Sequence, residues 1–180
     1  PSSGPVLGGT RLSVYGASFR ESATLRCRVE ESSATAVARL VGAGRLECGA
    51  PVSSGSGVRH IEVSINGQQY SSSGVEYTYR VAAVVSSVWP SRGAAEGGTP
   101  VTVLGSGFSS SAEALGGLWC RFNSTLARAS YVSEGAALCN TTQSGAGLVS
   151  VEVSTNGRDF SSGGAQYEYV LVSVTSLAPW

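Results

Sequence analysis

The chain contains one stretch of about ninety residues twice, and this internal repeat restricts its possible folds more than any other feature. Pro1, Pro90 and Pro179 follow one another at intervals of 89 residues. A Gly-Gly-Thr motif stands shortly after each of the first two prolines, at residues 8–10 and 97–99. A repeat of this length in 180 residues predicts two domains, each large enough for its own core. We expect domains at residues 1–87 and 88–176, with residues 177–180 opening a third copy.

Each copy has the sequence pattern of an all-β domain. Apolar residues alternate with polar ones in short runs, such as Ile61, Val63 and Ile65, and there is no sustained helical periodicity. An Asn-Gly pair follows such a run in each copy, at residues 66–67 and 156–157, and predicts a tight hairpin turn with two positive φ angles. Short strands between turn residues predict two tandem β-sandwiches, because a single β-barrel would not repeat its turns at a fixed offset.

The junction between the two copies is apolar. Residues 81–88 are rich in valine and lack the composition of a flexible Gly/Ser linker, so the last strand of the first domain is expected to run almost directly into the second. Trp89 and Pro90 stand at this expected inter-domain joint, where proline restricts the backbone. We expect Trp89 to pack in an interface between the domains, with a place in one domain's core as the alternative. Such a joint would make the array a stiff rod.

Four cysteines are present, two in each copy. Cys27 and Cys48 are 21 residues apart, and Cys120 and Cys139 are 19 residues apart, so neither pair has the close spacing of a zinc or redox motif. The spacing predicts one disulfide inside each domain, with reduced, buried cysteines as the alternative. A bridge that closes about 20 residues stabilises a small domain by roughly 3 kcal/mol.

Two asparagines of the second copy stand in sequons for N-linked glycosylation. They are Asn123, in Asn-Ser-Thr, and Asn140, in Asn-Thr-Thr. Each sequon alone is a weak signal in a chain so rich in serine and threonine. Together with paired cysteines, however, they favour a glycoprotein that is extracellular or displayed at the cell surface.

Residues suited to catalysis or metal binding are scarce in this sequence. His60 is the one histidine and stands on the polar side of its predicted strand, where an ordinary surface role is favoured over a general base. Asp159 is the one aspartate, which argues against a calcium site of the acidic-loop type. We therefore expect no catalytic residues, no metal and no cofactor, and hence no enzyme.

Charge and hydropathy restrict the expected partners. The net charge is zero, with 12 basic and 12 acidic residues, so the basic footprint that nucleic acid requires is missing. No run of about 18 apolar residues occurs, so we expect no direct membrane insertion of this segment.

The ordered set of repeated residues resembles the IPT/TIG family, the immunoglobulin-like modules shared by plexins, transcription factors and some secreted enzymes. The resemblance covers nearly the whole chain. In the second copy it rests on Pro90, Gly93, Gly97, Gly98, Thr99, Val101, Val103, Gly105, Phe108, Cys120, Arg121, Phe122, Leu138, Cys139, residues 149–154, Asn156, Gly157, Phe160 and residues 167–169. In the first copy it rests on Gly4, Gly8, Gly9, Thr10, Leu12, Val14, Gly16, Phe19, Cys27, Cys48, Ala50, Pro51, Ser64, Asn66, Gly67, Tyr70 and Tyr77.

The resemblance implies an early-Set immunoglobulin-like β-sandwich in each domain. In receptor-type members of the family the cysteine pair forms a disulfide. The second copy departs slightly from the pattern, because Asn140 and Thr141 replace the Ala-Pro that follows Cys48 in the first. The DNA-binding branch of the family reads DNA with basic loops. That branch is disfavoured here, because the corresponding turns are neutral overall.

These features favour a non-catalytic structural or adhesive segment of a larger secreted or cell-surface glycoprotein. Its expected partners are other copies of the protein, extracellular structural proteins and N-linked glycans, and the array would pack into a filament or coat. An arginine-rich composition without lysine suits a GC-rich source such as a green alga, whose surface coats or flagellar hairs use such proteins. The alternative is an accessory module pair, carbohydrate-binding or spacer, of a secreted carbohydrate-active enzyme. A third copy starting at Pro179 favours the structural function.

Overall fold

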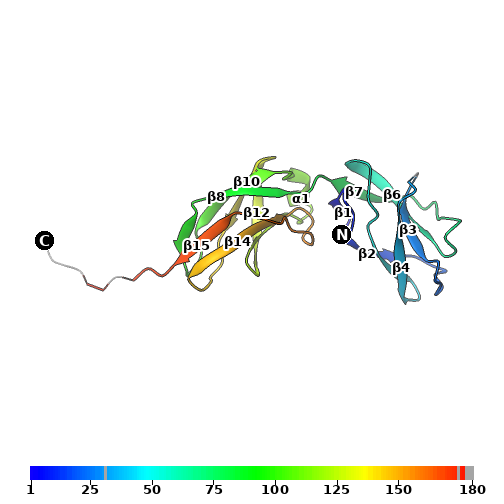
Figure 1. Cartoon of the computed structure of the whole chain (residues 1–180), viewed down its shortest axis with the longest axis horizontal. Coiled ribbons are helices and arrows are strands. Elements are labelled where there is room, and N and C mark those ends of the chain that lie inside the picture. Colours follow the sequence, from blue (N-terminus) through cyan, green and yellow to red (C-terminus); the bar gives the residue numbers. More distant parts are fainter. Residues whose placement is uncertain (31, 174, 177–180) are drawn as a thin grey trace. The chain divides into compact units, whose positions relative to one another are not determined.

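The computed structural model describes residues 1–30, 32–173 and 175–176. The chain divides into two compact units, Pro1–Ala82 and Ala83–Trp180. Regular structure in the described residues is almost entirely strand, with one short helix, α1 (Ser110–Ala114), in the second unit (Figure 1). The prediction of an all-β chain with two tandem sandwiches is confirmed. The third copy expected at residues 177–180 lies outside the described residues.

The first unit is built from seven strands in the spatial order β1-β7-β6-β3-β4-β5-β2. All neighbours are antiparallel except β1 and β7, which run parallel. The strand β4 joins the two layers of the sandwich, because residues 35–37 pair with β3 while residues 38–42 pair with β5. The strands are β1 (Ser3–Pro5), β2 (Arg11–Tyr15), β3 (Arg26–Val29), β4 (Thr35–Gly42), β5 (Arg45–Gly49), β6 (Gly57–Ser64) and β7 (Val75–Arg80).

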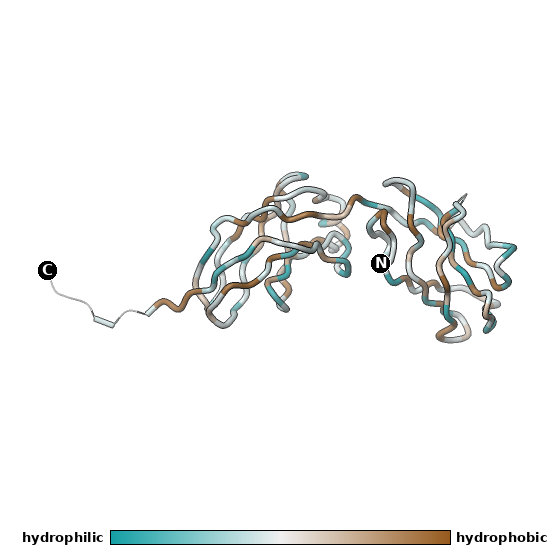
Figure 2. The backbone as a smooth tube through the Cα atoms, viewed as in Figure 1, coloured by the Kyte–Doolittle hydropathy of each residue, from teal (hydrophilic) through white to brown (hydrophobic). Residues whose placement is uncertain are grey.

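The core of the first unit comes from the alternating apolar residues of these strands. Leu46 and Tyr79 are almost completely buried, as is Leu25 just before β3, and Tyr77 packs edge-on against Tyr79 with 4.9 Å between ring centroids. Hydrophobic residues are distributed along the strands of both units in Figure 2. Burying one face of each strand in this way is the main stabilising contribution to a sandwich.

The second unit repeats this arrangement and adds one strand. Its order is β8-β10-β13-β12-β11-β14-β15-β9, and β12 passes between the layers as β4 does in the first unit. The parallel pair is now β9 with β15. The strands are β8 (Val84–Trp89), β9 (Arg92–Ala94), β10 (Pro100–Ser106), β11 (Trp119–Phe122), β12 (Thr125–Ser133), β13 (Ala136–Asn140), β14 (Gly147–Ser154) and β15 (Gln166–Val170).

The unit boundary differs from the expected division between Ser87 and Val88. The last strand of the first domain was expected within residues 81–88, with the domain ending at residue 87, but residues 84–89 form β8, the first strand of the second unit. The reason is its pairing, because β8 runs antiparallel to β10 and buries Val85 and Val88 in the second core. The connection between the units is therefore formed by residues 81–83, between β7 and β8.

The Asn-Gly pairs do not form the tight hairpins that the sequence predicts. Residues 65–74 join β6 to β7, so the connection is a longer loop. Only the glycine of each pair has a positive φ angle, 73° at Gly67 and 71° at Gly157. The Oδ1 atom of Asn66 instead accepts hydrogen bonds from the backbone N–H groups of Gln68 and Gln69, both at 3.0 Å. The asparagine side chain thus takes the place of a backbone carbonyl group as the hydrogen-bond acceptor, and the connection is a longer loop instead of a tight turn.

The end of β6 shows a related difference. Ile65 was expected to share a face with Ile61 and Val63, but β6 ends at Ser64 and the Ile65 side chain is exposed. Ser64 is buried instead, and its Oγ atom accepts a hydrogen bond from the N–H group of Gly67 at 2.8 Å. The loop is therefore anchored by a buried polar side chain at the last residue of the strand.

Candidate functional site

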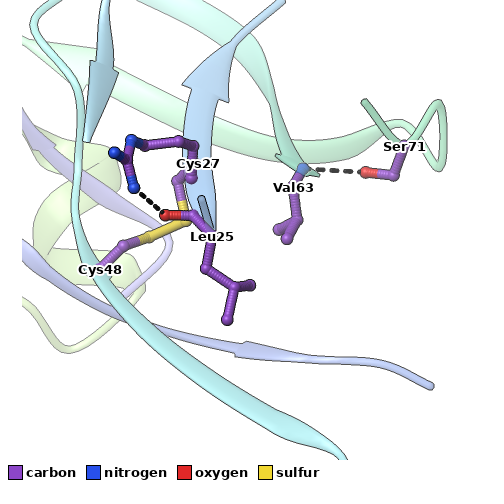
Figure 3. Close-up of a disulfide and its surroundings, with 6 residues drawn as sticks. Leu25, Cys27, Cys48, Val63 and Ser71 are labelled. Atoms are coloured by element: carbon purple, nitrogen blue, oxygen red, sulfur yellow. Dashed lines mark hydrogen bonds between the residues drawn. A yellow bond between two sulfur atoms is a disulfide. The ribbon is translucent and has the colours of Figure 1, made fainter. Parts of the chain in front are cut away.

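The four cysteines form one disulfide in each unit. Cys27 on β3 is bonded to Cys48 on β5, and Cys120 on β11 is bonded to Cys139 on β13, as the spacing predicts. All four are buried, and the described residues include no free cysteine. Figure 3 shows the first bridge beside Leu25, close to the point where Val63 on β6 donates a hydrogen bond to Ser71. Because β3 and β5 pair with different parts of β4, the bridge ties the two layers together.

Each unit also carries an arginine–glutamate pair covered by an aromatic ring. In the first unit, Arg28 Nε donates to Glu62 Oε2 at 2.6 Å, and the guanidinium lies 3.9 Å from the ring centroid of Tyr70. In the second unit, Arg121 Nε donates to Glu152 Oε2 at 2.7 Å. The same guanidinium lies 4.2 Å from the ring centroid of Phe160. A charge pair shielded by a ring is stronger than an open one.

Sequence reasoning did not identify these ion pairs as a unit. The signal was present, because Arg28 and Arg121 each follow the first cysteine of their copy directly. Their glutamate partners are identified only by the register of the paired strands, which places Arg28 opposite Glu62 and Arg121 opposite Glu152. The repetition of the cluster in both units marks it as part of the sandwich architecture.

Both sequon asparagines lie at the surface of the second unit. Asn123 occupies the turn between β11 and β12 with a φ of 56°, a conformation that asparagine tolerates better than most residues. Asn140 is the last residue of β13 and is also exposed. The two side chains are therefore accessible to a bulky group, and their glycosylation stays a prediction.

Trp89 and Pro90 do not stand at the connection between the units. Trp89 ends β8 and pairs with Thr102 of β10, inside the second unit. Its side chain is 73% exposed, so it belongs to neither core. The expectation of a joint at these residues followed from placing the last strand of the first domain within residues 81–88, and the pairing of β8 with β10 removes its basis.

The surroundings of His60 resemble part of a catalytic triad but lack its central contact. His60 Nδ1 pairs with the carboxylate of Glu30 at the edge of a hollow of about 590 Å³, which several serines also line. Ser53 Oγ, however, donates to the carbonyl oxygen of Gly55 at 2.8 Å. Among the described residues, no serine of this hollow makes a hydrogen bond to His60, and a nucleophile needs that contact with its base.

Two further electrostatic features involve single residues. The guanidinium groups of Arg11 and Arg45 hold the pKa of the Glu47 carboxyl below its ordinary value, chiefly through their hydrogen bonds. Burial raises the pKa of the Tyr79 hydroxyl, which donates to the carbonyl oxygen of Pro51 at 2.7 Å. Both groups serve the packing of the first unit.

The described part of the chain contains no group of three or more His, Cys, Asp or Glu side chains placed to hold a metal ion. None of its helices combines the length and hydrophobicity needed to span a bilayer.

Known proteins share both the sequence pattern and the fold. The IPT/TIG domain matches residues 1–79 and 83–169. Human Fibrocystin-L is 38% identical over 120 residues, in a match that covers 63% of this chain and 3% of that protein. The solved extracellular region of plexin A4 matches 96% of this chain at a TM-score of 0.55, with 21% identity, over 15% of its own length. The chain thus spans a small part of each relative.

Proposed function

This chain belongs to the IPT/TIG domain family, and we propose that it is a non-catalytic structural or adhesive segment of a larger secreted or cell-surface glycoprotein. The observation that carries this proposal is the pair of similar sandwiches, each closed by a buried disulfide between its layers. Disulfides of this kind persist in oxidising compartments outside the cytosol. The similar plexin A4 structure is that of an extracellular region, which agrees with this location.

The surface composition supports a role in packing and spacing. The chain has zero net charge, and charged residues make up 13% of it. Short side chains such as serine, glycine and alanine lose little conformational entropy when they are covered by a neighbour. We propose that the array packs beside other copies or other extracellular structural proteins, as a filament or coat of a GC-rich source such as a green alga. N-linked glycans on Asn123 and Asn140 would direct which faces remain open.

Native material tests the extracellular assignment directly. Peptide mapping of the protein from its natural source, without reduction, is expected to yield the Cys27–Cys48 and Cys120–Cys139 peptides. Mass spectrometry before and after treatment with a peptide N-glycosidase is expected to show mass loss at Asn123 and Asn140. Free thiols at all four cysteines together with unmodified asparagines would refute the extracellular function.

A second experiment separates the structural function from the accessory-module alternative. Electron microscopy of the full-length native protein is expected to show filaments or a regular coat. Trp89 and Tyr15 are exposed aromatic residues of the kind that can stack on sugars. Tight binding of the chain to a polysaccharide, lost in Trp89→Ala or Tyr15→Ala, would favour the accessory-module function.

A further inference from the structure

The outer face of one sheet layer is apolar in the second unit. This layer consists of β8, β10, β13 and β12, and one row across the four strands contains Trp89, Thr102, Leu138 and Ser130. Their side chains point away from the core, because the residue before each of them is buried. Trp89 is largely exposed, and Leu104 and Leu138 are 40% and 39% exposed. The row thus presents apolar surface to solvent.

The same face of the first unit is charged. Glu47 of β5 matches Leu138 of β13, because each directly precedes the second cysteine of its unit. Glu47 forms ion pairs with Arg11 of β2 and Arg45 of β5. A solvent-facing side of an antiparallel sheet ordinarily carries polar side chains in this way. The apolar row of the second unit departs from that rule, and contiguous exposed apolar surface marks a place that another group covers.

The sequon residue Asn140 lies on this apolar face. It follows Leu138 by two residues on β13, so both side chains point outward, and its partner across the strand pair is Pro100 of β10. Trp89 stands two strands away from Asn140 and two residues along, which corresponds to about 12 Å between their Cα atoms. The inner sugars of an N-linked glycan span such a distance. The first unit, whose face is charged, contains no sequon.

The surface on the β10 side of the sequon suits a sugar chain. Pro100 and Thr102 of β10, both compact and uncharged, lie between the sequon and Trp89. On the other side, β12 carries Arg128, whose guanidinium lies 4.2 Å from the ring centroid of Trp119. That ring is already covered, whereas Trp89 offers an exposed indole. Indole rings combine a large apolar area with a polar edge and are well suited to stack on sugars.

We propose that an N-linked glycan attached to Asn140 lies across the outer face of β10 and covers the indole ring of Trp89. The proposal rests on the glycosylation proposed above, and it names the face that the glycan closes. The inner sugars pack their C–H groups on the ring and keep their hydroxyl groups in water. The glycan therefore removes the apolar row from contact with neighbours, and the array packs through its other faces.

Hydroxyl-radical footprinting of the chain secreted from eukaryotic cells tests the proposal. Mass spectrometry first gives the fraction of Asn140 that carries a glycan. The oxidation rate of Trp89 is then compared between the glycosylated chain and Asn140→Gln. The rate should rise about threefold or more in the variant, because oxidation follows the exposed area of the ring. Asn123→Gln is the matched control and should leave the Trp89 rate unchanged, since its turn between β11 and β12 lies outside the row.

Two enzymatic treatments of the folded chain complement the variants. Trimming the glycan to its first sugar should expose Trp89 without any substitution, because one sugar does not reach the ring. In the second treatment, Trp89→Ala should speed the release of the Asn140 glycan by peptide N-glycosidase about threefold or more, because the glycan is no longer held on the surface. Release from Asn123 in the same molecules is the internal control. Leu148→Ala, at an exposed leucine of β14, should leave both release rates unchanged.

The outcomes separate this proposal from the function on which it rests. A glycan on Asn140 together with a Trp89 that reacts as fast as in Asn140→Gln would overturn the proposal alone, and would leave the face open to another protein. Equal release rates in the wild-type chain and Trp89→Ala would also overturn it. A secreted chain without sugar on Asn140 would overturn the proposal together with the glycosylation predicted at that residue.

Discussion

At the scale of single residues, one asparagine oxygen organises a long loop in each unit. In the second unit, Asn156 Oδ1 accepts hydrogen bonds from the N–H groups of Arg158 and Asp159, at 2.9 and 2.8 Å. A backbone N–H group that loses its partner in a partly buried loop costs more than the bond itself contributed. The loop therefore depends on the length and polarity of this side chain.

Replacing this asparagine should destabilise the second unit. Asn156→Ala removes the acceptor for two backbone donors and is expected to lower the free energy of unfolding by about 1–2 kcal/mol. Urea denaturation measures the change. Asn140→Ala is the control, because that exposed side chain should contribute less than about 0.5 kcal/mol. Equal stability of the two variants would show that the loop holds without its asparagine.

Glu47 gives the first unit a dependence on acid pH. Its carboxyl pKa is lowered in the folded state by Arg11 and then Arg45, below the ordinary value of 4.5. A carboxyl group whose pKa is lower in the folded than in the unfolded state stabilises the fold at pH values above its unfolded-state pKa. This stabilisation is lost as the pH falls through its folded-state pKa. The contribution is therefore present at neutral pH and disappears in acid.

The variant Glu47→Gln should show this dependence. At pH 7 the variant is expected to be less stable than the wild-type chain, and the difference should shrink as pH falls below 4.5. Thermal unfolding at a series of pH values measures it. Glu21→Gln, at an exposed carboxylate without an ion pair among the described residues, should follow the wild-type curve. A difference that stayed constant with pH would refute the electrostatic explanation.

At the scale of the elements, one strand in each unit changes layers and the disulfide holds the layers on either side of it. The strands β4 and β12 each pair with one sheet in their first part and the other in their second. Cys27 and Cys48 bridge the strands that flank β4, and Cys120 and Cys139 bridge those that flank β12. The bridge thus stabilises the sandwich where its backbone bends.

Removing one bridge should weaken one unit only. Cys27→Ala combined with Cys48→Ala is expected to reduce the stability of the first unit by about 2–4 kcal/mol. Without the bridge, the unfolded chain is no longer restricted by a closed loop, so its conformational entropy is higher. Hydrogen exchange resolved by peptide should show faster exchange in residues 1–82 and unchanged exchange in the second unit. The reciprocal pair, Cys120→Ala with Cys139→Ala, serves as the matched control. Faster exchange in both units of either variant would show that the units are coupled.

At the scale of the whole molecule, the chain is two units with separate cores, divided between Ala82 and Ala83. The division matters because it assigns β8 to the second unit. Val85 and Val88 are 5% and 8% exposed in the second core, so a fragment that begins inside β8 loses buried apolar surface.

Two fragments of the second unit test this division. A fragment of residues 83–176 should be more stable than one of residues 88–176 by about 2–4 kcal/mol, because the shorter one loses Val85 and most of the β8–β10 pairing. Chemical denaturation of both fragments measures the difference. Equal stability would place the boundary at the position expected from sequence, between Ser87 and Val88.

The sequence by itself determined the number of domains, the all-β class and the cysteine pairing. These properties depend on features that are local or periodic along the chain. The 89-residue interval sets the repeat, the alternation of apolar residues sets the strands, and two cysteines in each copy leave one pairing within a domain. Patterns of this kind report on backbone conformation and on which face of a strand is buried.

Only the tertiary structure decided which partners the local segments take. The valine-rich pattern of residues 84–89 predicts a strand that could belong to either domain, and its pairing with β10 places it in the second. Asn66 could have supplied a positive φ angle, but its side chain captured two backbone N–H groups instead. Strand register aligns Arg28 with Glu62. Pairing and register depend on contacts between residues far apart in sequence, which no local pattern specifies.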